Sequence, residues 1–190
     1  MKEIAKNSAL IIIDMQNDFV LTEKTAVKGA KATIPAIKHA MKICHEKNIP
    51  IFHIIRAYAE NGDNAEIFRK ELFQKGQGFC IAGTEGAQIV EELTPYKKDH
   101  IFVKPRFSAF FGTNLKEHLQ KKQITHVLVA GTQYPNCIRA TAVDGLCHDF
   151  YVTVLTDCCS AQTAEIAEAN CRDLRNMGIA CIDFTSLEWV

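Results

Sequence analysis

Six short apolar runs constrain the fold of this chain more than any other feature of its sequence. The first, at residues 9–13, is apolar at every position, which predicts a strand that is buried on both faces. Strands of this kind occur in parallel sheets, where helices cover both sides. The other predicted strands lie at residues 51–55, 101–103, 127–130, 152–155 and 179–182.

Stretches with helical periodicity separate most of these runs. In residues 32–47, apolar side chains recur at intervals that place them on one face of a helix. This alternation predicts an α/β fold with three layers, α/β/α, in which helices lie on both faces of a six-stranded, mostly parallel sheet. The other predicted helices cover residues 114–122, 137–148 and 164–177.

One connection is too long for this pattern. Residues 56–100 separate the second and third predicted strands and contain one predicted helix, at 65–73, and a short helical piece at 87–93. Long connections are often functional, so this segment is either a lid-like insertion or a passive surface loop. The length of 190 residues fits a single domain, 1–190, that includes it.

The bulk composition argues against several classes of function. Twenty-two basic residues balance 22 acidic ones, so the chain has no basic footprint for nucleic acid. The apolar run at 9–13 is too short for a signal peptide, and no run is long enough to cross a membrane. Eight cysteines without an export signal indicate a reducing compartment, so we expect a cytoplasmic protein.

Cys137 stands out among these cysteines because of its place between two predicted elements. It follows the strand at 127–130 and a turn containing Gly131 and Pro135, and it begins the helix at 137–148. The carboxyl ends of parallel strands are where α/β proteins bind ligands, and a helix N-terminus favours a thiolate. We therefore expect Cys137 to be a nucleophile, and most of the other cysteines to be buried and inert.

Two more polar residues follow predicted strands, and a parallel sheet would bring them to the same edge. Asp14 follows the strand at 9–13, and Lys104 follows the strand at 101–103. A thiol needs a base before it attacks, and a carboxylate within hydrogen-bond reach can serve. An ammonium beside the carboxylate keeps it ionised and also favours the thiolate. Taken singly, neither residue is a specific sign of catalysis. Asp14 is equally typical of a turn residue, and Lys104 is equally typical of a surface lysine.

Three ordered motifs resemble those of the isochorismatase-like cysteine hydrolases. They read DMQNDF at 14–19, KPRFSAFFGT at 104–113 and GTQYPNCIR at 131–139. This superfamily includes nicotinamidases, N-carbamoylsarcosine amidohydrolase, ureidoacrylate amidohydrolase and isochorismatase, and the resemblance covers residues 8–182. It implies a six-stranded parallel sheet of Rossmann-like order, a small-molecule substrate and homo-oligomers, as dimers or larger assemblies.

The resemblance also implies roles for individual residues. Asp14, Lys104 and Cys137 match the catalytic triad. The backbone N–H groups of Gln133 and Cys137 match the oxyanion hole, and in the family a cis peptide bond at the position of Thr132–Gln133 aims the first of them. The candidate substrate-binding residues are Phe19, Gln16, Arg106, Phe111 and Asn136.

The sequence departs from the family pattern where nicotinamidases bind their metal. Those enzymes carry an Asp-x-His motif just after the second strand, whereas this chain reads Arg56-Ala57-Tyr58, and residues 56–99 contain no histidine. We therefore expect no metal site and no cofactor. Isochorismatases proper have no nucleophilic cysteine at this position, so Cys137 argues against their reaction.

The expected function is metal-independent cleavage of a C–N bond in a small amide, carbamoyl or ureido compound through a thioester. Arg56, Arg106 and Arg139 are each candidates for binding a substrate carboxylate, although arginines in such positions are more often solvated or structural. Two alternatives stay open: nicotinamidase-type activity, and a catalytically silent binding or redox-sensing protein on the same fold.

Overall fold

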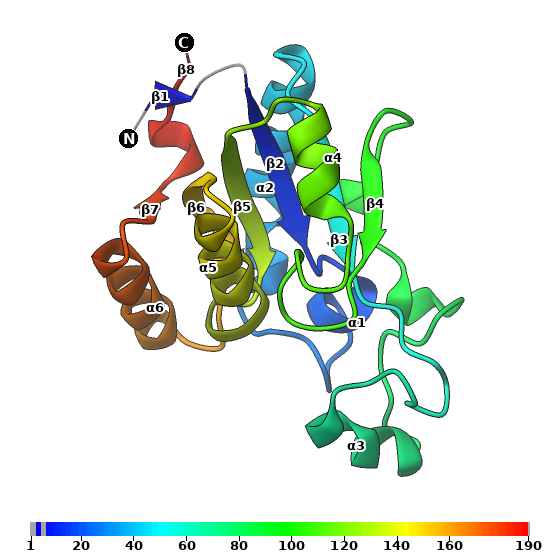
Figure 1. Cartoon of the computed structure of the whole chain (residues 1–190). Helices are drawn as coiled ribbons and strands as arrows, with labels where there is room; N and C mark the ends of the chain where they lie inside the picture. The colour runs from blue at the N-terminus through cyan, green and yellow to red at the C-terminus, as the bar shows by residue number, and fades with distance from the viewer. Residues whose placement is uncertain (1–2, 5–6, 190) are drawn as a thin grey trace.

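A six-stranded sheet forms the centre of the computed structural model, which describes residues 3–4 and 7–189 (Figure 1). The strand order is β4-β3-β2-β5-β6-β7, and all neighbouring strands are parallel. The predicted parallel sheet and its Rossmann-like order are confirmed, and each predicted apolar run overlaps one strand. The strands are β2 (Ser8–Ile13), β3 (Ile51–Ile55), β4 (His100–Val103), β5 (His126–Thr132), β6 (Tyr151–Ser160) and β7 (Ala180–Ile182).

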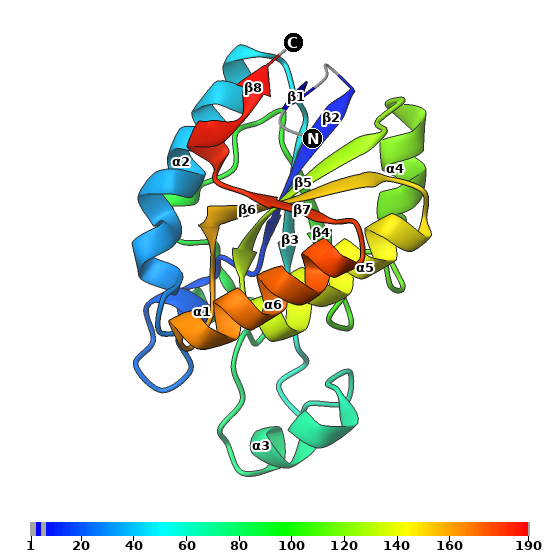
Figure 2. The same cartoon turned by 90° about the vertical axis from the view of Figure 1, so that its left-hand side faces the viewer.

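Helices cover both faces of this sheet, which confirms the three-layer α/β/α prediction (Figure 2). One face packs against α2 (Ala30–Glu46), and the other against α4 (Leu115–Lys121), α5 (Arg139–Cys147) and α6 (Ala164–Asn176). Within the described residues, no helix has the length and apolar character needed to cross a membrane. Short elements that the sequence did not predict are α1 (Asn17–Val20), the 3-10 turn η5 (Phe184–Ser186), and a parallel pair of strands, β1 (Glu3–Ile4) and β8 (Glu188–Trp189).

The central strand β2 shows why the predicted strands are apolar at every position. Ala9, Ile11 and Ile13 pack on the side of α4, α5 and α6. Leu10 and Ile12 pack on the side of α2. A fully buried aliphatic side chain stabilises a fold by roughly 1.5–3 kcal/mol, so both faces of β2 hold a helical layer onto the sheet.

The order of the strands creates a crevice beside β2. The chain places β3 and β4 on one side of β2, and β5, β6 and β7 on the other. The carboxyl ends of β2 and β5 therefore border a crevice of the kind in which open parallel sheets bind ligands. Asp14 directly follows β2, and the turn that holds Cys137 follows β5. The fold thus brings two of the three candidate catalytic residues to one place.

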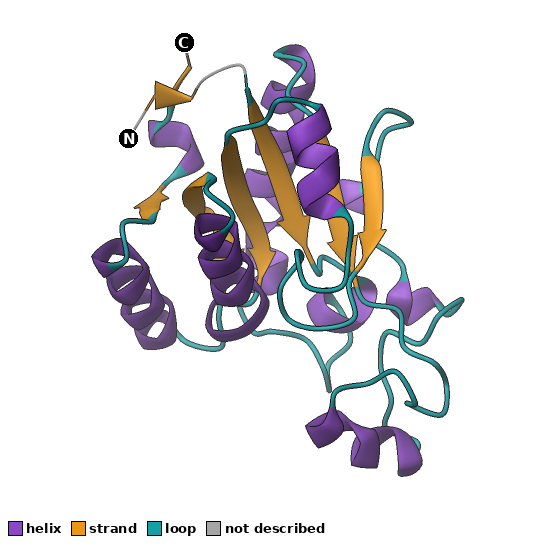
Figure 3. Cartoon of the chain, viewed as in Figure 1, coloured by secondary structure: helices purple, strands orange, loops and turns teal. Residues whose placement is uncertain are grey.

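The long connection (residues 56–99), between β3 and β4, extends beyond the carboxyl edge of the sheet and is mostly loop (Figures 1 and 3). The predicted helix at 65–73 starts later and is shorter, because Glu66 is extended and its carboxylate bonds to Tyr58. The predicted piece at 87–93 is two separate 3-10 turns. The elements of the connection are η1 (Ile67–Arg69), α3 (Lys70–Gln74), η2 (Glu85–Ala87) and η3 (Glu91–Leu93).

The long connection has a small apolar cluster of its own. Tyr58, Phe73, Phe79 and Cys80 are buried together in it. Phe19 of α1 packs edge-on against Phe79, with the ring centroids 5.5 Å apart. Edge-to-face aromatic pairs add to the stabilisation that comes from burial alone. The cluster therefore holds the connection against α1, which begins just after Asp14.

Gly131→Ala should lower the free energy of unfolding by clearly more than Gly76→Ala. Both glycines have positive φ, +112° and +69°, where a side chain is strained by about 1–2 kcal/mol. A Cβ at Gly131 would lie 2.1 Å from the backbone oxygen of Ile13, whereas a Cβ at Gly76 would meet nothing within 4 Å. Urea denaturation measures both losses, and equal values would contradict the close approach of β5 to β2.

Candidate active site

Asp14, Lys104 and Cys137 meet at the carboxyl edge of the sheet. Nζ of Lys104 lies 2.8 Å from Oδ2 of Asp14 and 3.3 Å from Sγ of Cys137. All three side chains are buried, with exposed fractions of 2% or less for Asp14 and Lys104 and 6% for Cys137. Because β3 lies between β2 and β4, the ion pair reaches across the end of a third strand. The strand-end argument therefore placed these side chains correctly.

Backbone hydrogen bonds at the strand ends position two of these side chains. Asp14 has a φ of +53°, a left-handed conformation that aspartate tolerates better than most residues. Its N–H donates to the carbonyl of Ile54, and the N–H of Lys104 donates to the carbonyl of Ile55. The hydrogen-bond ladder of the sheet thus reaches both residues and fixes the positions from which their side chains extend.

Cys137 lies inside a wide helical turn, which corrects the predicted start of the helix at Cys137. A π-helical turn, η4 (Tyr134–Ile138), precedes α5, and in it the N–H of Ile138 donates to the carbonyl of Gln133 at 3.3 Å. Pro135 suits the first turn of a helix, because its missing N–H would have no partner there. The peptide bond before Gln133 is cis, as the family resemblance implied.

The surroundings of Cys137 favour its thiol over its thiolate. Burial raises its pKa and the charge of Asp14 raises it further, while Lys104 and Arg56 lower it, which leaves a pKa of about 11. Burial therefore outweighs the nearby cations, and the net shift in the pKa of Cys137 is upward, against the expectation that its position would favour the thiolate. A base has to remove this proton before sulfur can attack, and Asp14 is the carboxylate beside it.

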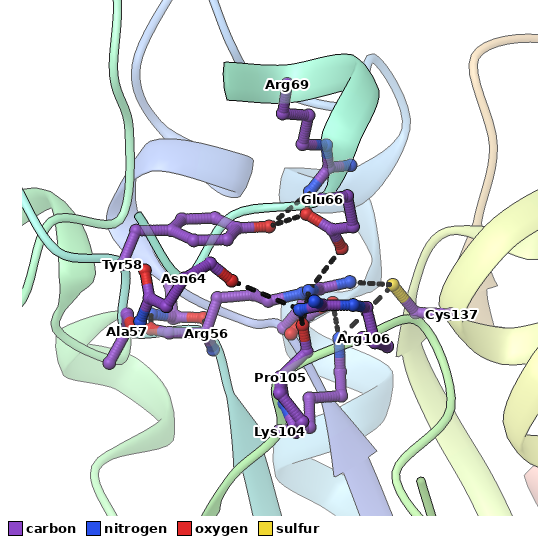
Figure 4. Close-up of polar contacts among 12 residues, drawn as sticks. Arg56, Ala57, Tyr58, Asn64, Glu66, Arg69, Lys104, Pro105, Arg106 and Cys137 are labelled. Carbon is purple, nitrogen blue, oxygen red and sulfur yellow. Dashed lines mark hydrogen bonds and ion pairs between the residues drawn. The ribbon is translucent and has the colours of Figure 1, made fainter. Parts of the chain in front are cut away.

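A buried arginine supplies a second cation next to the thiol. Nη2 of Arg56 lies 3.9 Å from Sγ of Cys137, and Nη1 lies 2.5 Å from Oε1 of Glu66 (Figure 4). Burial lowers the pKa of Arg56, but Asp14 and the other negative groups around it raise the pKa above its ordinary value. The guanidinium therefore remains charged between the Glu66 carboxylate and the thiol.

Glu66 connects Arg56 to two further side chains of the long connection (Figure 4). Its Oε2 accepts a hydrogen bond from the Tyr58 hydroxyl at 2.7 Å and lies 3.5 Å from Nη1 of Arg69. The same nitrogen of Arg69 donates to the Tyr58 oxygen at 2.5 Å. Burial raises the pKa of Glu66, but Arg56, Tyr58 and Arg69 together lower it below its ordinary value. One carboxylate therefore pairs with two guanidinium groups.

A very small cavity lies beside the thiol, and a larger groove lies outside it. The cavity has a volume of about 20 Å³, enough for roughly one water molecule, and the groove has about 640 Å³. Phe19, Arg69 and Gln133 line both spaces, so they form the boundary between the groove and the cavity. The remaining residues that line the cavity are Asp14, Val27, Thr132, Asn136 and Cys137.

Two of the predicted substrate-binding residues, Phe19 and Asn136, line this cavity. Gln16 does not line it. Its buried amide nitrogen donates to the carbonyls of Arg56 and Ala87, and its oxygen accepts the N–H of Arg56, each at 2.7 Å. The side chain of Gln16 therefore ties two parts of the long connection to the end of β2.

The other predicted substrate-binding residues lie outside the cavity. Arg106 is exposed, and its guanidinium donates to two backbone carbonyls. Phe111 is 58% exposed. Arg139 is a further candidate for binding a substrate carboxylate. Its Nη1 lies 3.1 Å from Oδ2 of Asp173 in α6, so the two side chains form an ion pair. Neither of these two arginines lines the small cavity beside Cys137.

The sequence analysis missed Glu66 and Arg69 and treated Tyr58 only as a departure from a motif. All three lie in the long connection, away from the strand ends, and the helix predicted at 65–73 gave no sign that Glu66 and Arg69 contact Tyr58. Within the described residues, no group of three or more His, Cys, Asp or Glu side chains is arranged to hold a metal ion. Where the resemblance would place metal ligands, Arg56 and Tyr58 form the network around Glu66.

Comparison with known proteins agrees with this geometry. Residues 8–186 match the isochorismatase domain family. The chain belongs to the isochorismatase family. A crystal structure of an isochorismatase family protein from Desulfovibrio vulgaris is similar to it with a TM-score of 0.92 and 46% identity, over 95% of each chain.

Some curated relatives within this family carry functional names. The chain is 39% identical over 183 residues to a probable inactive nicotinamidase of Arabidopsis thaliana, which covers 94% of this chain and 93% of that protein. It is 28% identical over 179 residues to the ureidoacrylate amidohydrolase RutB of Cronobacter turicensis, which covers 80% of this chain and 74% of that protein.

Glu66→Gln should lower the free energy of unfolding by about 3–5 kcal/mol, because it leaves the buried guanidinium of Arg56 without its carboxylate. Glu71→Gln is the matched control. It removes the exposed partner of Lys75 and should change stability by less than about 1 kcal/mol. Chemical denaturation measures both variants, and a loss in Glu66→Gln no larger than in the control would show that Arg56 does not depend on Glu66.

Alkylation of Cys137 by iodoacetamide should accelerate about tenfold per pH unit between pH 7 and pH 10, because only the thiolate reacts and its pKa is about 11. Lys104→Gln should move this profile to higher pH, since it removes a cation that lowers the pKa. Peptide-resolved mass spectrometry separates Cys137 from the exposed Cys147. A rate at Cys137 that levels off below pH 8 would contradict the raised pKa.

Proposed function

We propose that this chain is a cysteine hydrolase that cleaves the C–N bond of a small amide, carbamoyl or ureido compound without a metal ion. The observation that carries the proposal is the contact of Lys104 with both Asp14 and Cys137, buried in the crevice between β2 and β5. A base, a cation and a nucleophile within hydrogen-bond reach of one another are the parts that acyl transfer to sulfur requires.

In the first half of the reaction, Asp14 takes the proton of Cys137 as the substrate carbonyl arrives. Sγ then forms a bond to the carbonyl carbon, and the π electrons of the carbonyl move to its oxygen. When the carbonyl re-forms, the C–N bond breaks and the departing nitrogen takes the proton from Asp14. The products are an amine or ammonia and a thioester on Cys137.

In the second half, water replaces the leaving group. Asp14 accepts a proton from the water, whose oxygen adds to the thioester carbon, and the C–S bond then breaks. The proton returns to the sulfur, which restores the thiol. We place the oxyanion of both intermediates at the backbone N–H groups of Gln133 and Cys137, each of which would contribute about 3–4 kcal/mol.

Lys104 and Arg56 have a common electrostatic role in this proposal. Burial raises the pKa of the Cys137 thiol, and the two cations lie 3.3 and 3.9 Å from its sulfur. Both cations favour the negative charge that develops on sulfur when the proton leaves. Lys104 also orients Asp14, which it contacts directly.

The relatives support the class of substrate, and this chain's own residues support the absence of a metal. The ureidoacrylate amidohydrolase is named for cleaving a ureido compound. The probable inactive nicotinamidase is more similar to this chain and points away from efficient nicotinamide turnover. Arg56 and Tyr58 take the place of the metal motif in the sequence, and a guanidinium cannot ligate a metal ion.

A catalytically silent binding or redox-sensing protein is the second candidate function. The cavity of about 20 Å³ and the raised pKa of the thiol both favour the silent binding protein and count against redox sensing, because a closed site with a protonated sulfur is unreactive. The Arabidopsis relative that is named as probably inactive favours it as well.

Ammonia release from a panel of small amides and ureido acids decides between the two candidates. Cys137→Ala should abolish release while Cys147→Ala, which changes an exposed thiol, leaves the rate unchanged. A chelator should also leave it unchanged. Mass spectrometry of acid-quenched protein should detect an acyl group on Cys137. Release that persists in Cys137→Ala, or no release from any substrate by the wild type, would overturn the proposed reaction.

A further inference from the structure

Arg69 occupies the boundary between the outer groove and the thiol. Together with Phe19 and Gln133, it lines both the groove and the small cavity that contains Cys137. Among the residues that line the cavity, Arg69 is the only one with a cationic side chain. A substrate that passes from the groove to Cys137 therefore meets a positive charge at the entrance of the cavity that contains the reacting sulfur.

The guanidinium of Arg69 is held in one place by aromatic rings. Its Cζ lies 5.2 Å from the ring centroids of Phe68 and Phe79 and 5.5 Å from that of Phe107. Contacts of this kind orient a guanidinium and leave its N–H edge available for hydrogen bonds. In the described part of the chain, its hydrogen bond to Tyr58 and its contact with Glu66 both use Nη1.

The charge of Arg69 is not balanced within the site. Lys104 pairs with Asp14 at 2.8 Å, and Arg56 pairs with Glu66 at 2.5 Å. Arg69 shares that Glu66 carboxylate at the longer distance of 3.5 Å. Three cations therefore face two carboxylates, and the partly exposed Arg69 carries the remaining positive charge towards the cavity. Such an arrangement is complementary to an anion.

We propose that Arg69 binds a carboxylate of the substrate, so that this chain acts on amides, carbamoyl or ureido compounds that carry an acid group near the scissile carbonyl. This inference rests on the proposed hydrolase function and narrows its substrate class. Arg69 is a specificity-determining residue in this arrangement. Its N–H edge receives the carboxylate at the boundary, while the carbonyl group enters the cavity beside Cys137.

The other arginines near the site are committed elsewhere. Arg56 is fully buried against Glu66 and does not line the cavity. Arg106 donates to backbone carbonyls and Arg139 pairs with Asp173. Arg69 is therefore the arginine through which this site distinguishes an acid from a neutral amide of the same size.

Two alkylating reagents test the anion site without requiring turnover. Iodoacetate carries a carboxylate where iodoacetamide carries a neutral amide. Both reagents react with the same thiolate, so the ratio of their rates at Cys137 does not depend on the fraction of thiolate. Arg69→Gln should lower the iodoacetate-to-iodoacetamide ratio about tenfold or more, as expected for loss of a charge-assisted hydrogen bond. Arg69→Lys should lower it less, since the charge remains.

Lys75→Gln is the matched control, because it removes one positive charge from an exposed pair near α3. It should leave the ratio unchanged. The rate with iodoacetamide reports whether the site of each variant is intact. An unchanged iodoacetate-to-iodoacetamide ratio in Arg69→Gln, whether or not both rates fall, would overturn the role of Arg69.

Hydrolysis of matched substrates then separates this inference from the proposed function. Wild type should release ammonia faster from succinamate than from butyramide, and faster from N-carbamoylglycine than from ethylurea. Arg69→Gln should remove the preference by lowering kcat/KM for the acids alone. No turnover of any compound, combined with the altered alkylation ratio, would overturn the hydrolase and leave the anion site standing. Turnover without a preference for acids would support the hydrolase and overturn the role of Arg69 in binding a substrate carboxylate.

Discussion

The buried ion pair between Lys104 and Asp14 is the interaction on which the rest of the site depends. Two charges withdrawn from water are stable only when they lie close together and well oriented, and here they are 2.8 Å apart. The pair joins the ends of β4 and β2 across β3, so it requires three strands in parallel register. Once it is formed, the same ammonium lies 3.3 Å from Cys137 and offsets part of the cost of burying a thiolate.

The fold and the three central residues could be predicted because both follow from strand ends. An apolar run such as residues 9–13 marks a buried strand, and the polar residue that follows it lies at the carboxyl edge. Glu66 and Arg69 have no such marker, since their positions depend on how a long loop folds onto Tyr58 and Phe79. A motif can also mislead for this reason. Gln16 belongs to the DMQNDF motif, but its side-chain amide forms hydrogen bonds with the backbone of Arg56 and Ala87 and does not face the cavity.

A network of side chains lies where the family resemblance would place a metal centre. Arg56 contributes a fixed positive charge, and Glu66 and Tyr58 hold it in position. Unlike a metal ion, a guanidinium offers no open coordination position and cannot activate a bound water. In the proposed reaction the contribution of this network is therefore electrostatic, and the activation of water is assigned to the carboxylate of Asp14.

Gln16 has a mechanical consequence for access to the site. Its amide anchors the backbone at Arg56 and at Ala87, so the long connection is pinned near its start and again beyond its tip. The part of the connection that borders the groove, including Arg69 and Phe79, lies between these two anchors. The Phe19–Phe79 contact and the hydrogen bond from the N–H of Cys80 to Asp18 tie that part to α1, so α1 and Gln16 together hold one wall of the groove in place.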